Sequence, residues 1–189
     1  MSGFLVVFNP AAGRGRARRL WPQIAQALRA AELGFDFVQT RAPLDAVRLA
    51  EGAAGRYDAV IAAGGDGTVH EALNGLMRVP PGTRPALGVL PLGSGDDYAK
   101  MLPPLSPGAP RPQWRAALGA IARGESRAHD VGLMRGVHVG EPVLRVLRAR
   151  RVVIESEAPL VIEADGELPP LRTRRIEIEV VPRALRVLA

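Results

Sequence analysis

The stretch Ala59-Val-Ile-Ala-Ala-Gly-Gly-Asp-Gly-Thr-Val-His-Glu-Ala-Leu-Asn-Gly-Leu76 decides the fold. It begins with an apolar run short enough for a buried strand and ends with apolar residues at helical spacing. Thr68 and Glu71 have the spacing of a capping box, which predicts that the helix starts at Thr68. The glycines between these runs therefore lie in a strand-to-helix turn, where backbone N–H groups and the helix dipole favour an anion.

Two interpretations of this turn compete. It is either a tight turn with a helix cap or a site for phosphate or metal–phosphate. Its spacing fits neither the dinucleotide motif G-x-G-x-x-G nor the Walker motif G-x-x-x-x-G-K-[ST]. Three glycines around Asp66 exceed what a turn needs, so phosphate binding is the leading interpretation.

Composition indicates a globular protein with one ordinary domain, or one domain and a small appendage. The 189 residues are 47% hydrophobic and 23% charged, and only 4% are aromatic. The absence of cysteine excludes disulfides and thiolate metal sites. No apolar run approaches the roughly 20 residues of a membrane span, and the first eight residues do not form a signal peptide. We expect a cytoplasmic protein, with peripheral attachment to the inner membrane as an alternative.

The chain is basic, with a formal net charge of +6 and Lys100 as its one lysine. This balance attracts nucleic acid, an anionic membrane surface or a polyphosphate. Nucleic acid is not favoured, because aromatic stacking platforms for bases are not evident. The cluster Arg145, Arg148, Arg150 and Arg151 either faces anionic lipid or is simply solvated.

Four expected strands alternate with helices, which predicts an α/β fold: a Rossmann-like parallel sheet with helices on both faces. The expected strands are Phe4–Phe8, Phe35–Thr40, Ala59–Ala63 and Ala86–Pro91. The expected helices include one that starts or kinks at Pro22 and stops at Gly34, one from Pro43 to Glu51, and one at Arg115–Arg123. Ligands of such sheets bind at the carboxyl ends of strands, so the loops Asn9–Arg16, Gly64–Thr68 and Gly93–Tyr98 should converge on one site.

After Asp130 the pattern changes to strands alone, at Val143–Glu155, Leu160–Ala164 and Arg174–Val187. We therefore expect two domains, 1–130 and 131–189, the second being a small antiparallel β element.

Three motifs taken together resemble the catalytic domain of the diacylglycerol kinase family, which includes sphingosine, ceramide and bacterial lipid kinases. They are Asn9-Pro-Ala-Ala-Gly13-Arg-Gly15, Gly64-Gly-Asp-Gly-Thr68 and Leu90-Pro-Leu-Gly93-Ser-Gly-Asp-Asp97-Tyr-Ala, in the family's order over roughly residues 3–135. The resemblance implies ATP-dependent, Mg²⁺-dependent transfer of a γ-phosphoryl to a lipid hydroxyl in phospholipid biosynthesis. It also implies a peripheral protein that meets its lipid at an anionic membrane surface.

The resemblance also implies site residues. Glu167, in the segment Asp165-Gly-Glu167, would be the catalytic base, although Asp-Gly is equally a hairpin signal. Asp66 would be catalytic and would hold Mg²⁺ together with Asp97. The positions that match nucleotide contacts are Asn9, Thr40, Gly64, Gly65, Asp66, Gly67, Thr68, Val69, His70, Gly93 and Ser94.

Two departures from the family keep alternatives open. Asp96 stands where the family usually has Asn, and the 59 residues from Val131 are fewer than the family's second domain, so that domain is shortened here. No counterpart of the family's structural Mg²⁺ loop is found. The chain is then a minimal lipid kinase, an inactive or partner-binding nucleotide-binding remnant, or an NAD-kinase-like enzyme. An exposed apolar face on the β element would favour the partner-binding remnant and could drive formation of a homodimer.

Overall fold

The computed structural model describes residues 3–102, 114–137, 150–160 and 173–188. The chain forms two compact units, of which the first comprises Met1–Ala128 with Leu185–Ala189 and the second His129–Ala184. The last residues, which the sequence analysis assigns to the second domain, thus belong to the first unit. The domain boundary at Asp130 stays a prediction.

The first unit is built on a parallel sheet, as predicted. Its strands lie in the order β2-β1-β3-β4 and are β1 (Gly3–Phe8), β2 (Phe35–Gln39), β3 (Tyr57–Gly64) and β4 (Ala86–Pro91). Beside β4, the end of β7 (Thr173–Leu188) adds a further parallel partner, with Val187 opposite Leu87.

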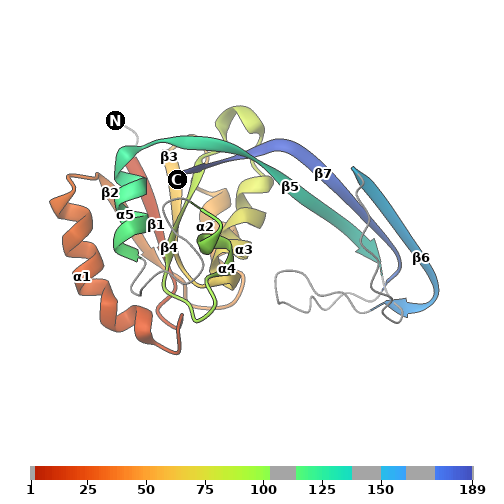
Figure 1. Ribbon diagram of the computed structural model, residues 1–189, viewed down its shortest axis with the longest axis horizontal. Helices are drawn as coiled ribbons and strands as arrows, with labels where there is room; N and C mark the ends of the chain where they lie inside the picture. Colours follow the sequence, from red (N-terminus) through yellow and green to blue (C-terminus); the bar gives the residue numbers. More distant parts are fainter. Residues whose placement is uncertain (1–2, 103–113, 138–149, 161–172, 189) are drawn as a thin grey trace. The chain divides into compact units, whose positions relative to one another are not determined.

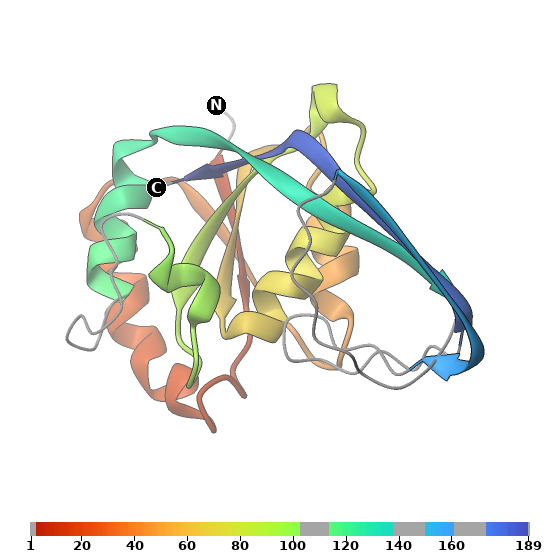
Figure 2. The same cartoon turned by 45° about the vertical axis from the view of Figure 1, so that its right-hand side comes forward.

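Helices cover both faces of this sheet. In Figures 1 and 2, α1 (Arg16–Ala30) and α5 (Trp114–Arg123) lie on one side, and α2 (Asp45–Glu51) and α3 (Asp66–Met77) lie on the other. The 3-10 turn η1 (Pro81–Thr83) precedes β4, and the short α4 (Asp97–Lys100) follows it. This two-faced cover favours apolar strands at the centre of the sheet, and β4 is buried at all its positions.

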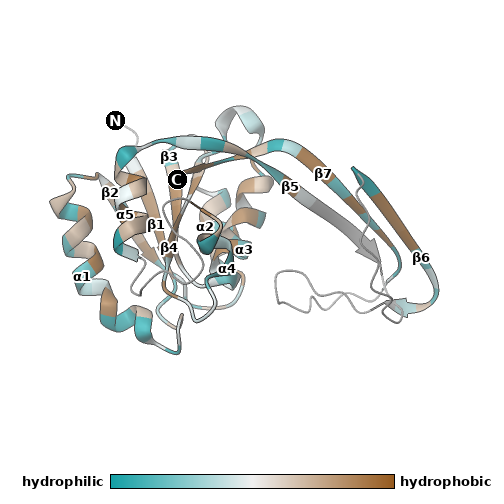
Figure 3. Ribbon diagram, in the orientation of Figure 1, coloured by the Kyte–Doolittle hydropathy of each residue, from teal (hydrophilic) through white to brown (hydrophobic). Residues whose placement is uncertain are grey.

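The core consists mainly of aliphatic side chains, which Figure 3 shows as hydrophobic colour along β1, β3 and β4. The helices contribute fully buried residues, including Ile24, Leu28, Leu76 and Ile121. One aromatic cluster joins α1 to the edge of the sheet: the rings of Trp21 and Phe37 stack with centroids 4.1 Å apart, and Phe8 lies 4.7 Å from Trp21.

The predicted capping box is wrong. Helix α3 begins at Asp66 with Gly65 as its N-cap, so Thr68 already lies inside the first turn. Its hydroxyl accepts a hydrogen bond from Asn9, and the Glu71 carboxylate accepts one from the Ala46 amide of α2. Both side chains that would cap the helix are therefore used in tertiary contacts.

The first helix differs from its prediction at both ends: it begins at Arg16, not near Pro22, and ends before Gly34, while a kink at Pro22 stays a prediction. Helix α1 runs through Pro22, which lies on the exposed face, because Ile24 and Leu28 beyond it pack into the core. It ends at Ala30, four residues before Gly34. The left-handed conformation that commonly ends a helix is adopted by Glu32, with φ of 53°.

The second unit is made of strands, in agreement with the expected β element. Strand β6 (Arg151–Leu160) pairs antiparallel with β7, which also neighbours β5 (Ser126–Val137). The register puts Ile154 opposite Ile176 on one face. The other face carries charge, including the Arg151–Glu177 ion pair at 2.5 Å. Strand β6 continues through Pro159 to Leu160, but its register on β7 shifts between Glu155 and Leu160, where the sequence predicted a break; residues 143–149 and 161–164 lie outside the described residues.

Among the described residues, the helices are all too short or too polar to cross a membrane.

The close packing of α2 on α3 generates a test. A Cβ added at Gly75 would overlap the Val47 carbonyl oxygen and lie 3.0 Å from the Ala50 Cβ. We expect Gly75→Ala to destabilise the protein by about 1–3 kcal/mol, because overpacking outweighs the better helix propensity of alanine. Chemical denaturation measures this. Gly82→Ala is the matched control, since an added Cβ there meets nothing within 4 Å and should leave stability nearly unchanged.

Candidate functional site

The loops that follow the parallel strands start at one edge of the sheet, as predicted. Backbone hydrogen bonds connect each strand end with its neighbour: the Thr40 amide donates to Phe8 and the Asn9 amide to Ala63, both at 2.9 Å. The Leu92 amide donates to Gly64 at 2.8 Å. At this edge α1, α3 and α4 also begin (Figure 2).

Asn9 joins the first loop to the helix that follows the second. Its side-chain amide donates to the Thr68 hydroxyl at 3.0 Å, and its carbonyl oxygen accepts from the Ala11 amide at 3.0 Å. Thr68 is buried, so this bond is shielded from water. The Asn9 side chain thus has a structural role in shaping the site, and its contact with nucleotide stays a prediction.

Gly65 and Gly93 bring the second and third loops together. A Cβ built on Gly93 would lie 2.5 Å from the Gly65 Cα, and one built on Gly65 would lie 3.1 Å from the Gly93 Cα. Only glycine allows this backbone-to-backbone approach. The Gly93 amide in turn donates to the buried Asp96 carboxylate at 2.7 Å, which closes the third loop on itself.

Two carboxylates converge beside Gly95. A Cβ built there would lie 2.9 Å from Oδ2 of Asp66 and 3.3 Å from Oδ2 of Asp97, so both carboxylates border Gly95. The other oxygens have protein partners: Oδ1 of Asp66 accepts from the Tyr98 amide at 3.2 Å, and Oδ1 of Asp97 accepts from Lys100 at 2.5 Å. Each carboxylate is thus held through Oδ1, and its Oδ2 lies beside Gly95.

This pair fits the chemistry of Mg²⁺. The ion prefers one or two carboxylates and keeps several waters, so it needs no larger cage of ligands. Among the described residues, no group of three or more His, Asp or Glu side chains could hold a metal. The adjacent first turn of α3 supplies amide groups of Asp66 and Gly67, and amides at this position have no intrahelical partner. A metal–phosphate group therefore suits this edge of the sheet.

The remaining predicted residues have different environments. Thr40 lies at the end of β2, where its hydroxyl donates to the Phe8 carbonyl at 3.4 Å. Val69 is buried, so only its backbone could reach a ligand, whereas Ser94 is exposed and His70 is half-buried. Glu167 lies outside the described residues.

Two residues of this site are absent from the sequence prediction. Arg16 donates from Nη2 to the Gly93 carbonyl at 2.6 Å and so connects α1 with the third loop. Tyr98 presents its amide to Asp66, and burial raises the pKa of its phenol. The sequence position of Arg16 could have indicated its role. It follows a glycine-rich loop directly and lies in the first turn of a helix, where the helix dipole disfavours a cation.

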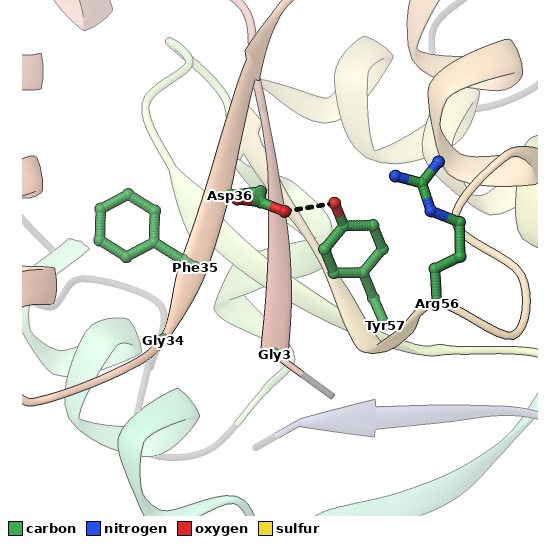
Figure 4. Close-up of a pocket in the computed structure, with 6 residues that line it drawn as sticks. All are labelled: Gly3, Gly34, Phe35, Asp36, Arg56 and Tyr57. Carbon is green, nitrogen blue, oxygen red and sulfur yellow. Dashed lines mark hydrogen bonds between the residues drawn. The ribbon is translucent and has the colours of Figure 1, made fainter. Parts of the chain in front are cut away.

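The described residues also form a pocket of about 360 Å³ at the opposite edge of the sheet (Figure 4). It is lined by the first residues of β1, β2 and β3, and the Tyr57 hydroxyl donates to Asp36 there at 2.5 Å. This hydrogen bond raises the pKa of Tyr57. Because it faces the amino ends of the strands, the pocket is separate from the loops that carry the predicted residues.

Known families match both parts of the chain. The diacylglycerol kinase catalytic domain matches residues 3–134. The chain belongs to that family, as its three loop motifs predicted. The YegS C-terminal NAD kinase beta sandwich-like domain matches residues 128–189, the region of the expected β element. The family is one of kinases.

Individual relatives agree with this assignment. The diacylglycerol kinase of Bacillus subtilis is 36% identical over 132 residues, which are 69% of this chain and 41% of that protein. A solved diacylglycerol kinase from Bacillus anthracis superimposes with a TM-score of 0.60 at 29% identity, over 70% of this chain and 44% of its own. Another Bacillus anthracis structure gives a TM-score of 0.79 at 19% identity, over 99% and 98% of the two chains, which confirms the fold. The chain therefore spans less than half the length of the curated relative.

The closed third loop generates a test. Asp96 has a left-handed backbone, with φ of 58°, and its carboxylate satisfies the buried Gly93 amide. Asp96→Ala should destabilise the protein by about 1–3 kcal/mol, since it leaves that donor unpaired. Asp96→Asn should retain most of the stability, because asparagine keeps an acceptor oxygen and tolerates this conformation. Denaturant titration of both variants distinguishes them; equal losses would contradict the assigned role.

Proposed function

We propose that this protein transfers the γ-phosphoryl of ATP to a lipid hydroxyl, diacylglycerol or a related lipid. The observation that carries the proposal is the placement of Asp66 and Asp97 beside Gly95, next to two glycine-rich loops at the carboxyl ends of parallel strands. Membership of the diacylglycerol kinase family supports the same reaction.

Phosphoryl transfer depends chiefly on positioning and on neutralising charge. Amides of the Gly64–Thr68 turn would bind phosphate oxygens, and Asp66 with Asp97 would hold Mg²⁺ beside them. Bound Mg²⁺ would supply charge neutralisation on the phosphates. Glu167 would accept the proton of the acceptor hydroxyl, whose oxygen bonds to the γ-phosphorus as the bond to the departing ADP oxygen breaks.

A lipid acceptor at an anionic membrane surface is consistent with the net charge of +6. The chain covers 41% of the Bacillus subtilis diacylglycerol kinase, and the lipid acceptor is proposed from family membership together with this charge. A cytoplasmic protein that attaches peripherally to the membrane, as a monomer or homodimer, is part of the proposal.

One assay separates the candidate functions. Labelled ATP and Mg²⁺ are incubated with diacylglycerol, phosphatidylglycerol, a sphingoid base and NAD in parallel. Labelled lipid supports the proposal, whereas labelled NAD supports an NAD-kinase-like enzyme. Nucleotide binding without any labelled product would overturn the proposal in favour of a nucleotide-binding remnant.

One prediction from this proposal concerns the pair Asp66 and Asp97. Asp66→Asn keeps an acceptor for the Tyr98 amide but removes the negative charge beside Gly95. We expect at least about a 100-fold loss of lipid phosphorylation with an unchanged unfolding midpoint, because removing one electrostatic group from a transition state costs factors of this size. The matched control is Asp58→Asn, an exposed carboxylate near the start of β3, which should retain activity. Full turnover by Asp66→Asn would refute the metal assignment.

Another prediction from this proposal concerns Glu167, the proposed base. Glu167→Gln should lower kcat by about 100-fold or more and leave ATP binding unchanged, since general-base catalysis typically contributes 10²–10⁴-fold. Rate measurements at saturating ATP and calorimetric titration with ATP–Mg²⁺ provide the two readouts. Glu157→Gln, an exposed carboxylate on β6, is the control. A Glu167 variant with the control's kcat would show that Asp165-Gly-Glu167 is only a turn.

A further inference from the structure

Arg16 occupies an unusual position for a cation. It is the first residue of α1, and the first turn of that helix contains no acidic residue. Positive charge at a helix N-terminus is unfavourable, because the dipole leaves partial positive charge at that end. The stability of α1 therefore gives no reason for an arginine here, and its contacts must be sought outside the helix.

The guanidinium of Arg16 reaches the point where the three loops meet. Its Nη2 donates to the Gly93 carbonyl at 2.6 Å, although the two residues are 77 positions apart. Gly93 is also the residue that packs against Gly65 and whose amide binds Asp96. Arg16 thus holds the backbone of the third loop directly beside the glycine turn of the second.

Gly13 makes room for this side chain. With φ of 59°, its backbone is left-handed, and an added Cβ would lie 2.5 Å from the Leu92 oxygen and 3.4 Å from Nε of Arg16. The arginine side chain therefore passes closely over a residue that has no side chain. The absence of a side chain at Gly13 thus leaves space for the Arg16 side chain.

Nε of Arg16 is buried and has no hydrogen-bond partner in the described part of the chain. A buried donor without a partner typically costs about 1–3 kcal/mol, so such groups are rare and call for an explanation. Guanidinium groups bind phosphate by presenting several N–H donors in one plane. Among the described residues near this loop, Arg16 combines that chemistry with a fixed place beside the glycine turn.

We infer that Arg16 is a positioning residue with two roles: it fixes the third loop through the Gly93 carbonyl, and it presents positive charge to the polyphosphate of the nucleotide. The inference rests on the proposed function, since it assumes that the glycine turn binds phosphate. It adds a cation from the first loop to the amides and carboxylates that are proposed to bind phosphate and Mg²⁺.

The experiment compares three variants of the full chain. Arg16→Gln keeps a donor for the Gly93 carbonyl but loses the charge, and Arg16→Lys keeps the charge but loses the planar donors. Arg18→Gln is the control, because Arg18 is exposed in the same turn of α1 and its loss changes the net charge equally. Calorimetric titration with ATP–Mg²⁺ and with inorganic tripolyphosphate measures binding, and thermal denaturation measures the structural role.

We expect Arg16→Gln to bind both probes about ten-fold more weakly, the factor that corresponds to one charge-assisted hydrogen bond. Arg16→Lys should recover part of this loss, and Arg18→Gln should bind like the parent protein. If Arg16→Gln and Arg16→Lys lower the unfolding temperature but bind tripolyphosphate normally, the arginine is only structural and the inference is overturned. The inference is also overturned if Arg16→Gln and Arg18→Gln lose equal affinity for the two probes.

The outcome is separable from that of the proposed function. A parent protein that binds tripolyphosphate through Arg16 but labels no lipid would keep this inference and refute the lipid kinase. A parent protein that labels lipid, with Arg16→Gln unaffected in affinity, would refute this inference alone. A parent protein that binds neither probe would refute both.

Discussion

The contact between the backbones of Gly65 and Gly93 is the constraint on which the site depends. No side chain separates the two loops, so the turn that opens α3 and the turn that follows β4 share one surface. A methyl group at either position would push them apart. The position of Asp66 relative to Asp97 follows from this contact, because each carboxylate belongs to one of the two turns.

Side-chain hydrogen bonds then hold together the loops that the glycines allow to approach. Asn9 binds Thr68 across the first and second loops, and Arg16 binds Gly93 across the first and third. Within the third loop, Asp96 binds the Gly93 amide. Polar groups thus brace the loops at the sheet edge, whereas aliphatic side chains stabilise the layers beneath them. Loops held together by these hydrogen bonds need few further residues to bind a charged ligand.

Local pattern was sufficient to predict the parallel sheet, because buried strands such as Ala86–Pro91 are continuous apolar runs. It also predicted which loops meet, since parallel strands end at one edge. It failed where residues with a local sequence signal make tertiary contacts instead. Thr68 and Glu71 have capping-box spacing, but each binds a different element, and Pro22 is tolerated because residues beyond it are buried. The Arg16–Gly93 bond joins residues 77 positions apart, which no local pattern reveals.

The pairing of Val187 with Leu87 has a consequence for the order of folding. More than half of the chain lies between these two residues, so their pairing is a non-local contact of the kind that forms late in folding. During synthesis, β4 emerges from the ribosome long before the strand that pairs with it on that side. Until the end of β7 arrives, β4 presents an open sheet edge, which is the kind of surface that recruits other unfolded chains. The edge of β4 is therefore open to other chains from its own synthesis until β7 has been made.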